Sequence, residues 1–174
     1  MHGTDFLVAL RNIMPSRTEL EACGLDPDQI TSVQATFKFI PRKPSGAGSD
    51  SARTEIERMI LDNDCSTLEI GLIRFLDRPH KHRHGVQVAF CEADPVVVWP
   101  GGTVAMHDHA NPDDTVICAA DSERFLDALS TFLTIRLEKS KWKGRINEAA
   151  DICAEKAGGN DFTTFFRMLC SSLA

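Results

Sequence analysis

The apolar residues of the first third of the chain mostly follow a helical period. In residues 5–14 and 54–62 they recur three and four positions apart, which predicts two amphipathic helices. Residues 16–19 have the form of a capping box, and residues 26–29 have the composition of a second helix entry. Residues 33–40 instead alternate apolar and polar side chains, which predicts a strand.

From residue 68 onward, short apolar or alternating segments are separated by turn sequences. A valine run follows Asp94-Pro95, and Pro100-Gly101-Gly102 has the composition of a turn. Closely spaced strands with turn signals between them are typical of an antiparallel meander. The predicted strands are 68–76, 86–91, 96–99, 103–106 and 115–119.

The helical period returns after residue 120. Asp121 or Ser122 is placed to cap a long helix, whose apolar face holds Phe125, Leu126, Leu129, Phe132 and Leu133. A second helix is expected over 146–157, and a last one begins at Asn160 or Asp161. The predicted fold is therefore α+β, with an antiparallel meander sheet packed against N-terminal and C-terminal helices.

The length of 174 residues suits a single domain, 1–174. Residues 41–51 hold two prolines, two glycines and three serines, which predicts a linker or mobile loop. The segment before it is too short to bury a core of its own. We therefore divide the domain into an N-terminal extension (1–45), a core (54–138) and a C-terminal helical appendage (139–174).

Net charge, the length of the apolar runs and cysteine spacing indicate which kinds of partner and which cellular location to expect. A formal charge of −6 disfavours nucleic acid and anionic membranes as partners and leaves room for a basic protein. No apolar run approaches the ~18 residues of a membrane span, and the first residues lack the pattern of a signal peptide, so a cytoplasmic location is expected. The six cysteines form no closely spaced pair and are expected to be reduced and structural.

The histidines are the feature that invites chemistry. Two clusters hold five of the six: His80, His82, His84, His107 and His109. In an extended chain a His-x-His sequence places both rings on one face, so two such clusters have the composition of a metal site. The plainer interpretation makes residues 80–84 a solvated loop tip and residues 107–109 a polar hairpin end.

The second cluster resembles the first metal motif of cupins and cysteine dioxygenases through Gly101, His107, His109 and Asp113. That resemblance implies a small metal-dependent enzyme that uses His107 and His109. Against it, no histidine follows His109, and the residues after Cys118 are predicted to be helical where a barrel needs strands. We favour structural or surface roles, and expect no cofactor, no metal ligand and no catalytic residue.

Residues 86–129 resemble the C-terminal half of domains of the SUKH superfamily, which includes fungal cell-wall-synthesis regulators and bacterial toxin-immunity proteins. The matching residues are Val98-Trp99 and, after a glycine turn and the segments 104–108 and 116–119, Ala120-Asp121-Ser122 with Phe125-Leu126. The resemblance implies an α+β fold without catalytic residues that engages a partner protein. It suggests an immunity-type or regulatory function, with a basic toxin domain as one possible partner.

The partner surface is expected at the polar strand ends and loops, where binding groups on a rigid sheet tend to lie. Glu92 and Asp94 are predicted to share a solvent face at a strand end. The basic residues of 139–145 are assigned to an ordinary turn at a helix C-terminus, where cations complement the helix dipole. The candidate partner-binding residues are His80, His82, Arg83, Glu92, Asp94, His107, Asp108, His109, Asp113 and Asp114.

Overall fold

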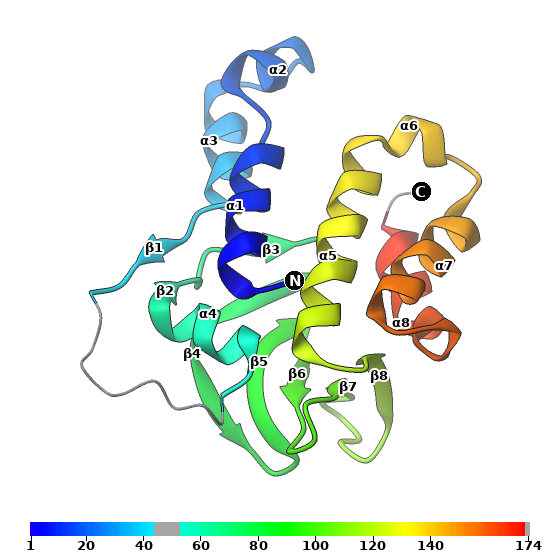
Figure 1. Cartoon of the computed structure of the whole chain (residues 1–174). Helices are drawn as coiled ribbons and strands as arrows, with labels where there is room; N and C mark the ends of the chain where they lie inside the picture. The colour runs from blue at the N-terminus through cyan, green and yellow to red at the C-terminus, as the bar shows by residue number, and fades with distance from the viewer. Residues whose placement is uncertain (44–52, 173–174) are drawn as a thin grey trace.

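A computed structural model describes residues 1–43 and 53–172 of the chain (Figure 1). Its α-helices are α1 (Gly3–Ile13), α2 (Arg17–Ala22), α3 (Pro27–Ala35), α4 (Glu55–Asp62), α5 (Ser122–Leu137), α6 (Lys139–Trp142), α7 (Ile146–Ala157) and α8 (Thr163–Ser171). A 3₁₀ turn over Asn160–Phe162 precedes α8. The strands are β1 (Ile40–Pro41), β2 (Asn63–Asp64), β3 (Glu69–Ile70), β4 (Ile73–His82), β5 (Gly85–Cys91), β6 (Asp94–Val98), β7 (Val104–His107) and β8 (Thr115–Ala119).

The predicted fold class is confirmed. Strands β3 to β8 form a six-stranded antiparallel sheet in which every strand pairs with its neighbours in sequence, and β1 and β2 form a separate pair. Helices precede and follow the sheet along the chain. In the described part of the chain, none of the helices combines the length and the apolar composition needed to cross a bilayer.

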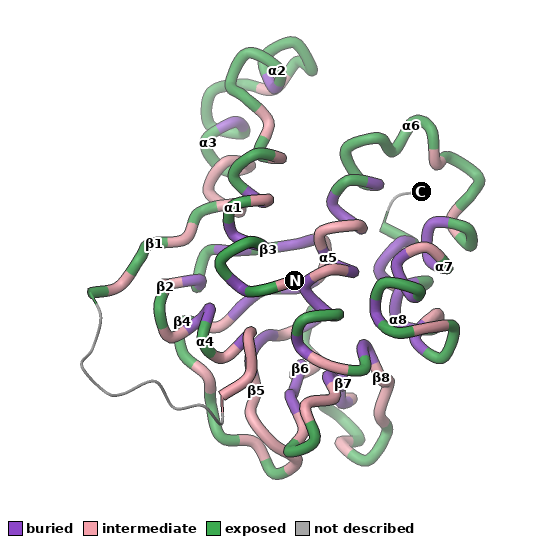
Figure 2. Tube along the Cα trace, viewed as in Figure 1, coloured by how far each residue is buried: buried purple, intermediate pink, exposed green. Residues whose placement is uncertain are grey.

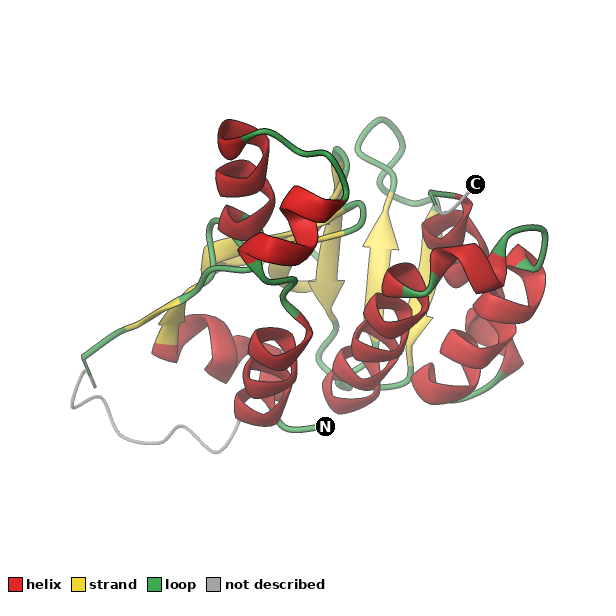
Figure 3. Cartoon of the chain, turned by 90° about the horizontal axis from the view of Figure 1, so that it is seen from above, coloured by secondary structure: helices red, strands yellow, loops and turns green. Residues whose placement is uncertain are grey.

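The helices cover one face of the sheet (Figure 3). Purple, buried stretches of the tube lie where α1, α4 and α5 meet one another and the strands (Figure 2). Residues of all of these elements belong to one hydrophobic cluster, which includes Phe6, Phe75 and Phe132. Gly71 lets β3 turn into β4 beneath α5, because its φ is +62° and a Cβ there would lie 2.9 Å from the ring of Phe132.

Helices α7 and α8 pack beside α5 and extend the same cluster. The buried face of α7 consists of small residues, Ala149, Ala150, Cys153, Ala154 and Ala157, which allows its neighbours to approach closely. On α8, Phe165 lies edge-on against Phe166 at 5.1 Å between ring centroids. The small side chains on α7 are therefore complemented by large aromatic side chains on α8.

The second face of the sheet has a small buried layer of its own. Val97 pairs with Ala105, both are fully buried, and neither belongs to the main cluster. Side chains alternate along a strand, so His107 faces the same side as Ala105. This outer layer carries the candidate site.

The β4–β5 hairpin is bent by a shift in register. Phe75 pairs with Ala89 but His80 pairs with Gln87, so β4 uses more residues than β5 over this stretch. Extra residues in one strand bend a hairpin and increase its twist, and Pro79 falls within the irregular part where a proline is tolerated. The bend brings the end of the hairpin over the outer face of the sheet.

Three sequence predictions need correction or fall outside the described residues. The strand predicted over 33–40 is wrong, because α3 continues to Ala35 and only Ile40–Pro41 is extended. Its aromatic residues serve helix packing instead, with the guanidinium of Arg11 4.6 Å from the centroid of the Phe39 ring. The loop tip predicted over 80–84 is wrong for residues 80–82, since β4 runs to His82 and only Arg83 and His84 form the turn. Most of the predicted linker lies in 44–52, outside the described residues.

Candidate functional site

His107 is the centre of the outer layer. It is the last residue of β7, and it is only 1% exposed. The indole nitrogen of Trp99 donates to Nε2 at 3.1 Å, and Nδ1 lies 3.1 Å from the carbonyl oxygen of Pro112. A carbonyl only accepts, so Nδ1 carries the proton and Nε2 is the acceptor. His107 is therefore neutral, with both ring nitrogens engaged.

Two further imidazoles from the bent hairpin pack against His107. The ring of His84 stacks on it with 4.5 Å between centroids and an angle of 4° between planes. His82 lies 5.3 Å from His107 and 5.6 Å from His84. Nε2 of His84 is buried and has no hydrogen-bond partner among the described residues. These three histidines and Trp99 form a compact aromatic group, which we call the imidazole layer.

Burial in this layer affects proton binding. Desolvation lowers the pKa of His82, and the neighbouring His107, His84 and Arg83 lower it further. Desolvation also lowers the pKa of His107, although its hydrogen bond to Pro112 acts in the opposite direction. Both effects favour neutral rings, which can stack without mutual repulsion.

The loop after β7 is organised by its own polar groups. Oδ1 of Asp108 accepts hydrogen bonds from the backbone N–H groups of Ala110 and Asn111 at 2.6 and 3.0 Å. These bonds hold the pKa of Asp108 below its usual value. The side chain of Asn111 in turn donates to Asp114 at 2.8 Å. The loop is therefore a defined turn.

Two contacts connect this loop to neighbouring segments. Arg83 in the β4–β5 turn pairs with Asp113 at 2.8 Å. Asp94 at the start of β6 accepts from Nδ1 and from the backbone N–H of His109, at 2.7 and 3.0 Å. The hydrogen bond to Asp94 raises the pKa of His109. We call the resulting surface the loop rim; its residues are Arg83, Glu92, Asp94, Asp108, His109, Asp113 and Asp114.

The structure groups most of the predicted site residues and separates some. His82 and His107 lie in the imidazole layer beneath the rim, so the polar hairpin end predicted for 107–109 is wrong for His107. His80 is exposed on β4, and its side chain has no hydrogen bond or ring contact with the described residues. Glu92 is not at a strand end but in the turn between β5 and β6, with a φ of 55°.

Four residues outside the candidate partner-binding set pack or bond within the imidazole layer, namely His84, Trp99, Pro112 and Thr115. His84 belongs to the same His-x-His pattern as His82, which is a usable signal for it. The contacts of Trp99 and Pro112 depend on the bend of the hairpin and the path of the loop. No local sequence pattern encodes either of them.

The contacts of His107 and His109 bear on the metal-dependent alternative. Among the described residues, two groups of three have ligand atoms within 4.8 Å of one another, namely His2 with Glu55 and Glu123, and Asp94 with Asp108 and His109. His107 is in neither group, and its ring nitrogens are engaged by Trp99 and Pro112. Among the described residues, His107 therefore joins no group of three possible ligands with His109, which the cupin-like motif would require.

Comparisons of the chain with models of protein families, with curated proteins and with solved structures find no match. The similarity to SUKH domains therefore stays a prediction.

Proposed function

We propose that the protein is a non-enzymatic, cytoplasmic binding module that engages a basic partner protein through the loop rim. The observation that carries the proposal is the connection of three separate segments into one acidic surface by the Arg83–Asp113 and Asp94–His109 contacts. The rim contains five carboxylates, two of them in direct contact with Arg83 or His109. A surface of one charge sign accelerates encounter with a partner of the other sign.

Both ring nitrogens of the buried His107 form hydrogen bonds within the protein, which supports a binding function over a catalytic one. A general base or metal ligand needs a nitrogen that is free to reach its target. Both nitrogens of His107 are used by Trp99 and Pro112, so the ring at the centre of the imidazole layer has no nitrogen free for either role. An immunity-type or regulatory protein of the SUKH kind needs such a rigid surface and no reactive centre.

Paired charge-neutralising variants test the proposal. The rim variant is Glu92→Gln/Asp113→Asn, and the matched control is Glu155→Gln/Asp151→Asn on α7, whose two residues are also exposed. Each variant removes one glutamate and one aspartate charge, so the net charge of the protein is the same in both. The partner is isolated by cross-linking in the native cells, then purified and titrated against all three proteins.

We expect a partner that is basic and whose affinity for the rim variant is about tenfold lower, mainly through a slower association rate that depends on salt. The control variant should bind like the wild type. Equal binding by both variants, or an acidic partner, would show that the rim is not the binding surface.

A further inference from the structure

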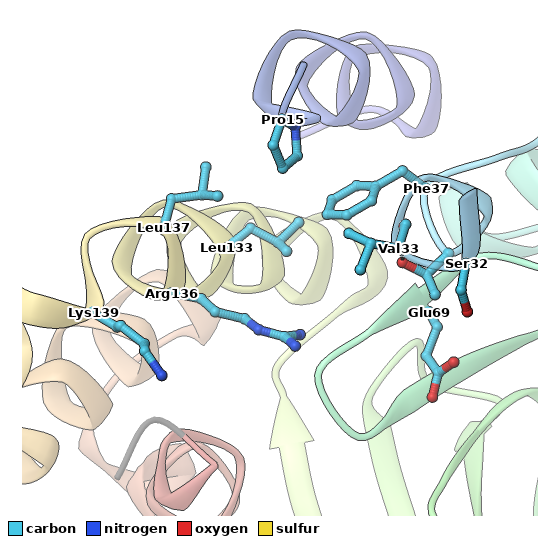
Figure 4. A pocket seen from close by; sticks show the side chains of 10 residues that line it. Pro15, Ser32, Val33, Phe37, Glu69, Leu133, Arg136, Leu137 and Lys139 are labelled. Atoms are coloured by element: carbon cyan, nitrogen blue, oxygen red, sulfur yellow. Dashed lines mark hydrogen bonds between the residues drawn. The ribbon is translucent and has the colours of Figure 1, made fainter. Parts of the chain in front are cut away.

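A groove separates the N-terminal helices from the C-terminal end of α5 (Figure 4). It consists of two adjoining cavities of about 320 and 680 Å³, which share Pro15, Arg136, Leu137 and Lys139. In Figure 4, Leu133 on α5 points toward Val33 of α3 and toward Phe37, and Leu137 lies one turn further along α5. These volumes fall in the range of natural binding pockets.

The groove leaves large apolar side chains in water. Leu137 is 52% exposed and Met14 is 38% exposed, and each lines at least one of the two cavities. Among the described residues, Val8 and Ile40 are the only other large apolar side chains exposed to this extent. Apolar groups that line an open groove mark a contact surface, because covering them releases their hydrating water.

Two cations that form no ion pair with a described residue flank this apolar surface. Arg136 and Lys139 line both cavities, and neither forms an ion pair with a described residue. Of the carboxylates that line the groove, Glu19 is held by Ser16 in the capping box of α2, at 2.7 Å. The other, Glu69, forms no ion pair with a described residue.

The charge at this end of the molecule contrasts with that of the whole chain. Residues 136–145 hold five cations and one carboxylate, although the protein has a net charge of −6. Two copies that met through this surface about a two-fold axis would bring their basic segments together. An occupant with carboxylates beside its apolar residues matches both features of the groove.

We propose that the groove binds an acidic amphipathic helix of a partner protein. Apolar residues of that helix, spaced three and four positions apart, would cover Leu137 and Met14 between α3 and α5. Its flanking carboxylates would pair with Arg136 and Lys139 at the opening. Helix-in-groove recognition of this kind is common among proteins. The site is distinct from the loop rim, and its partner has the opposite charge.

Peptide selection with a matched counter-selection tests the proposal. A display library of random peptides of about 15 residues, long enough for four helical turns, is selected on the wild-type protein and depleted on Leu137→Asp. A second depletion arm uses Val8→Asp, since Val8 is also 52% exposed but does not line either cavity. Circular dichroism and thermal unfolding confirm that both variants fold.

Peptides that bind the groove should have an apolar face and an excess of Asp and Glu. They should not bind Leu137→Asp, so depletion on that variant should leave them in the library. They should bind Val8→Asp, so depletion on that variant should remove them. Affinity of a synthetic winner should fall about tenfold or more on Leu137→Asp and severalfold on Arg136→Gln/Lys139→Gln. The latter variant should also weaken the dependence on salt.

Several results would overturn the proposal. The selected peptides could be basic, or they could bind Leu137→Asp and the wild type equally. The library could also yield no peptide whose binding is reduced by Leu137→Asp. An apolar small molecule found in the groove by native mass spectrometry, or dimers lost on Leu137→Asp, would assign the surface to another occupant. The rim variant Glu92→Gln/Asp113→Asn should bind the winners normally, so failure of one site is distinguishable from failure of the other.

Discussion

The loop rim and the groove lie at opposite ends of the molecule in Figure 1. They differ in how far their side chains are buried and bonded to other residues of the protein. Beneath the rim, His107 has partners for both ring nitrogens and is buried. In the groove, Leu137 is half exposed and Arg136 has no ion-pair partner among the described residues. The comparison shows that substitutions below the rim should cost stability, whereas substitutions in the groove should cost binding.

The largest expected effect is that of Gly85→Ala at the start of β5, directly after the β4–β5 turn. Gly85 has a φ of +155°, and a Cβ there would lie 2.1 Å from the carbonyl oxygen of Val98. The turn has to move away from β6, so we expect a loss of about 3 kcal/mol in the free energy of unfolding. Urea denaturation measures it. Gly101→Ala is the control, because a Cβ there meets nothing within 4 Å; equal stability of the two variants would contradict the described turn.

Replacement of His107 by leucine comes next. The variant keeps an apolar contact but leaves the indole N–H of Trp99 and the carbonyl of Pro112 without a partner in a buried layer. We expect a loss of about 2 kcal/mol in the free energy of unfolding, measured by urea denaturation. His109→Leu, at a side chain that is 63% exposed, should change it by less than about 1 kcal/mol. A His107→Leu protein as stable as the wild type would show that these two bonds contribute nothing.

Acid should weaken the imidazole layer. The folded protein binds protons on His82 and His107 less readily than the unfolded chain, in which the pKa of histidine is about 6.5. The unfolded state is therefore protonated first, and the free energy of unfolding falls as the pH drops through about 6.5 toward the lower folded-state values. The raised pKa of His109 acts in the opposite direction, but its exposure makes that effect small.

Urea denaturation at several values between about pH 8 and pH 5 measures this dependence. His107→Leu should show a shallower fall than the wild type, because it lacks one of the two groups. An identical pH dependence in both proteins would mean that His107 does not contribute to it.

The smallest effect on stability is expected in the groove. Leu137→Ala removes apolar atoms that are already half exposed, so the free energy of unfolding should change by less than about 0.5 kcal/mol. Leu133→Ala, one turn earlier on the same helix, removes a side chain that is only 2% exposed and should cost about 2–4 kcal/mol. Comparable losses in the two variants, measured by urea denaturation, would show that Leu137 is part of the core and not of a binding surface.

Local sequence signals account for most of the elements. The capping box at Ser16 begins α2, Asp121 caps α5 through the backbone N–H of Arg124, and Gly158 ends α7. Each of these depends on a few adjacent residues, which a sequence displays directly. The strand predicted over 33–40 failed because its alternating aromatic residues pack against helices rather than in a sheet.

The candidate site was predictable only in part. Of the candidate partner-binding residues, Arg83 pairs with Asp113 and Asp94 pairs with His109, so the structure brings these four together. The burial of His107 was not predictable, because it depends on residues from four separate segments. No pattern in the sequence predicts the groove, since Met14 and Leu137 are ordinary apolar positions at helix ends.

The sequence by itself determined the α+β class, the order of most of the longer helices and strands, and the acidic character of the chain. These follow from short-range periodicity, capping and composition. Only the tertiary structure decided which imidazoles are buried and which apolar side chains stay exposed. Both depend on a bent hairpin and on the packing of distant helices, and burial is a property of the assembled surface that no single segment carries.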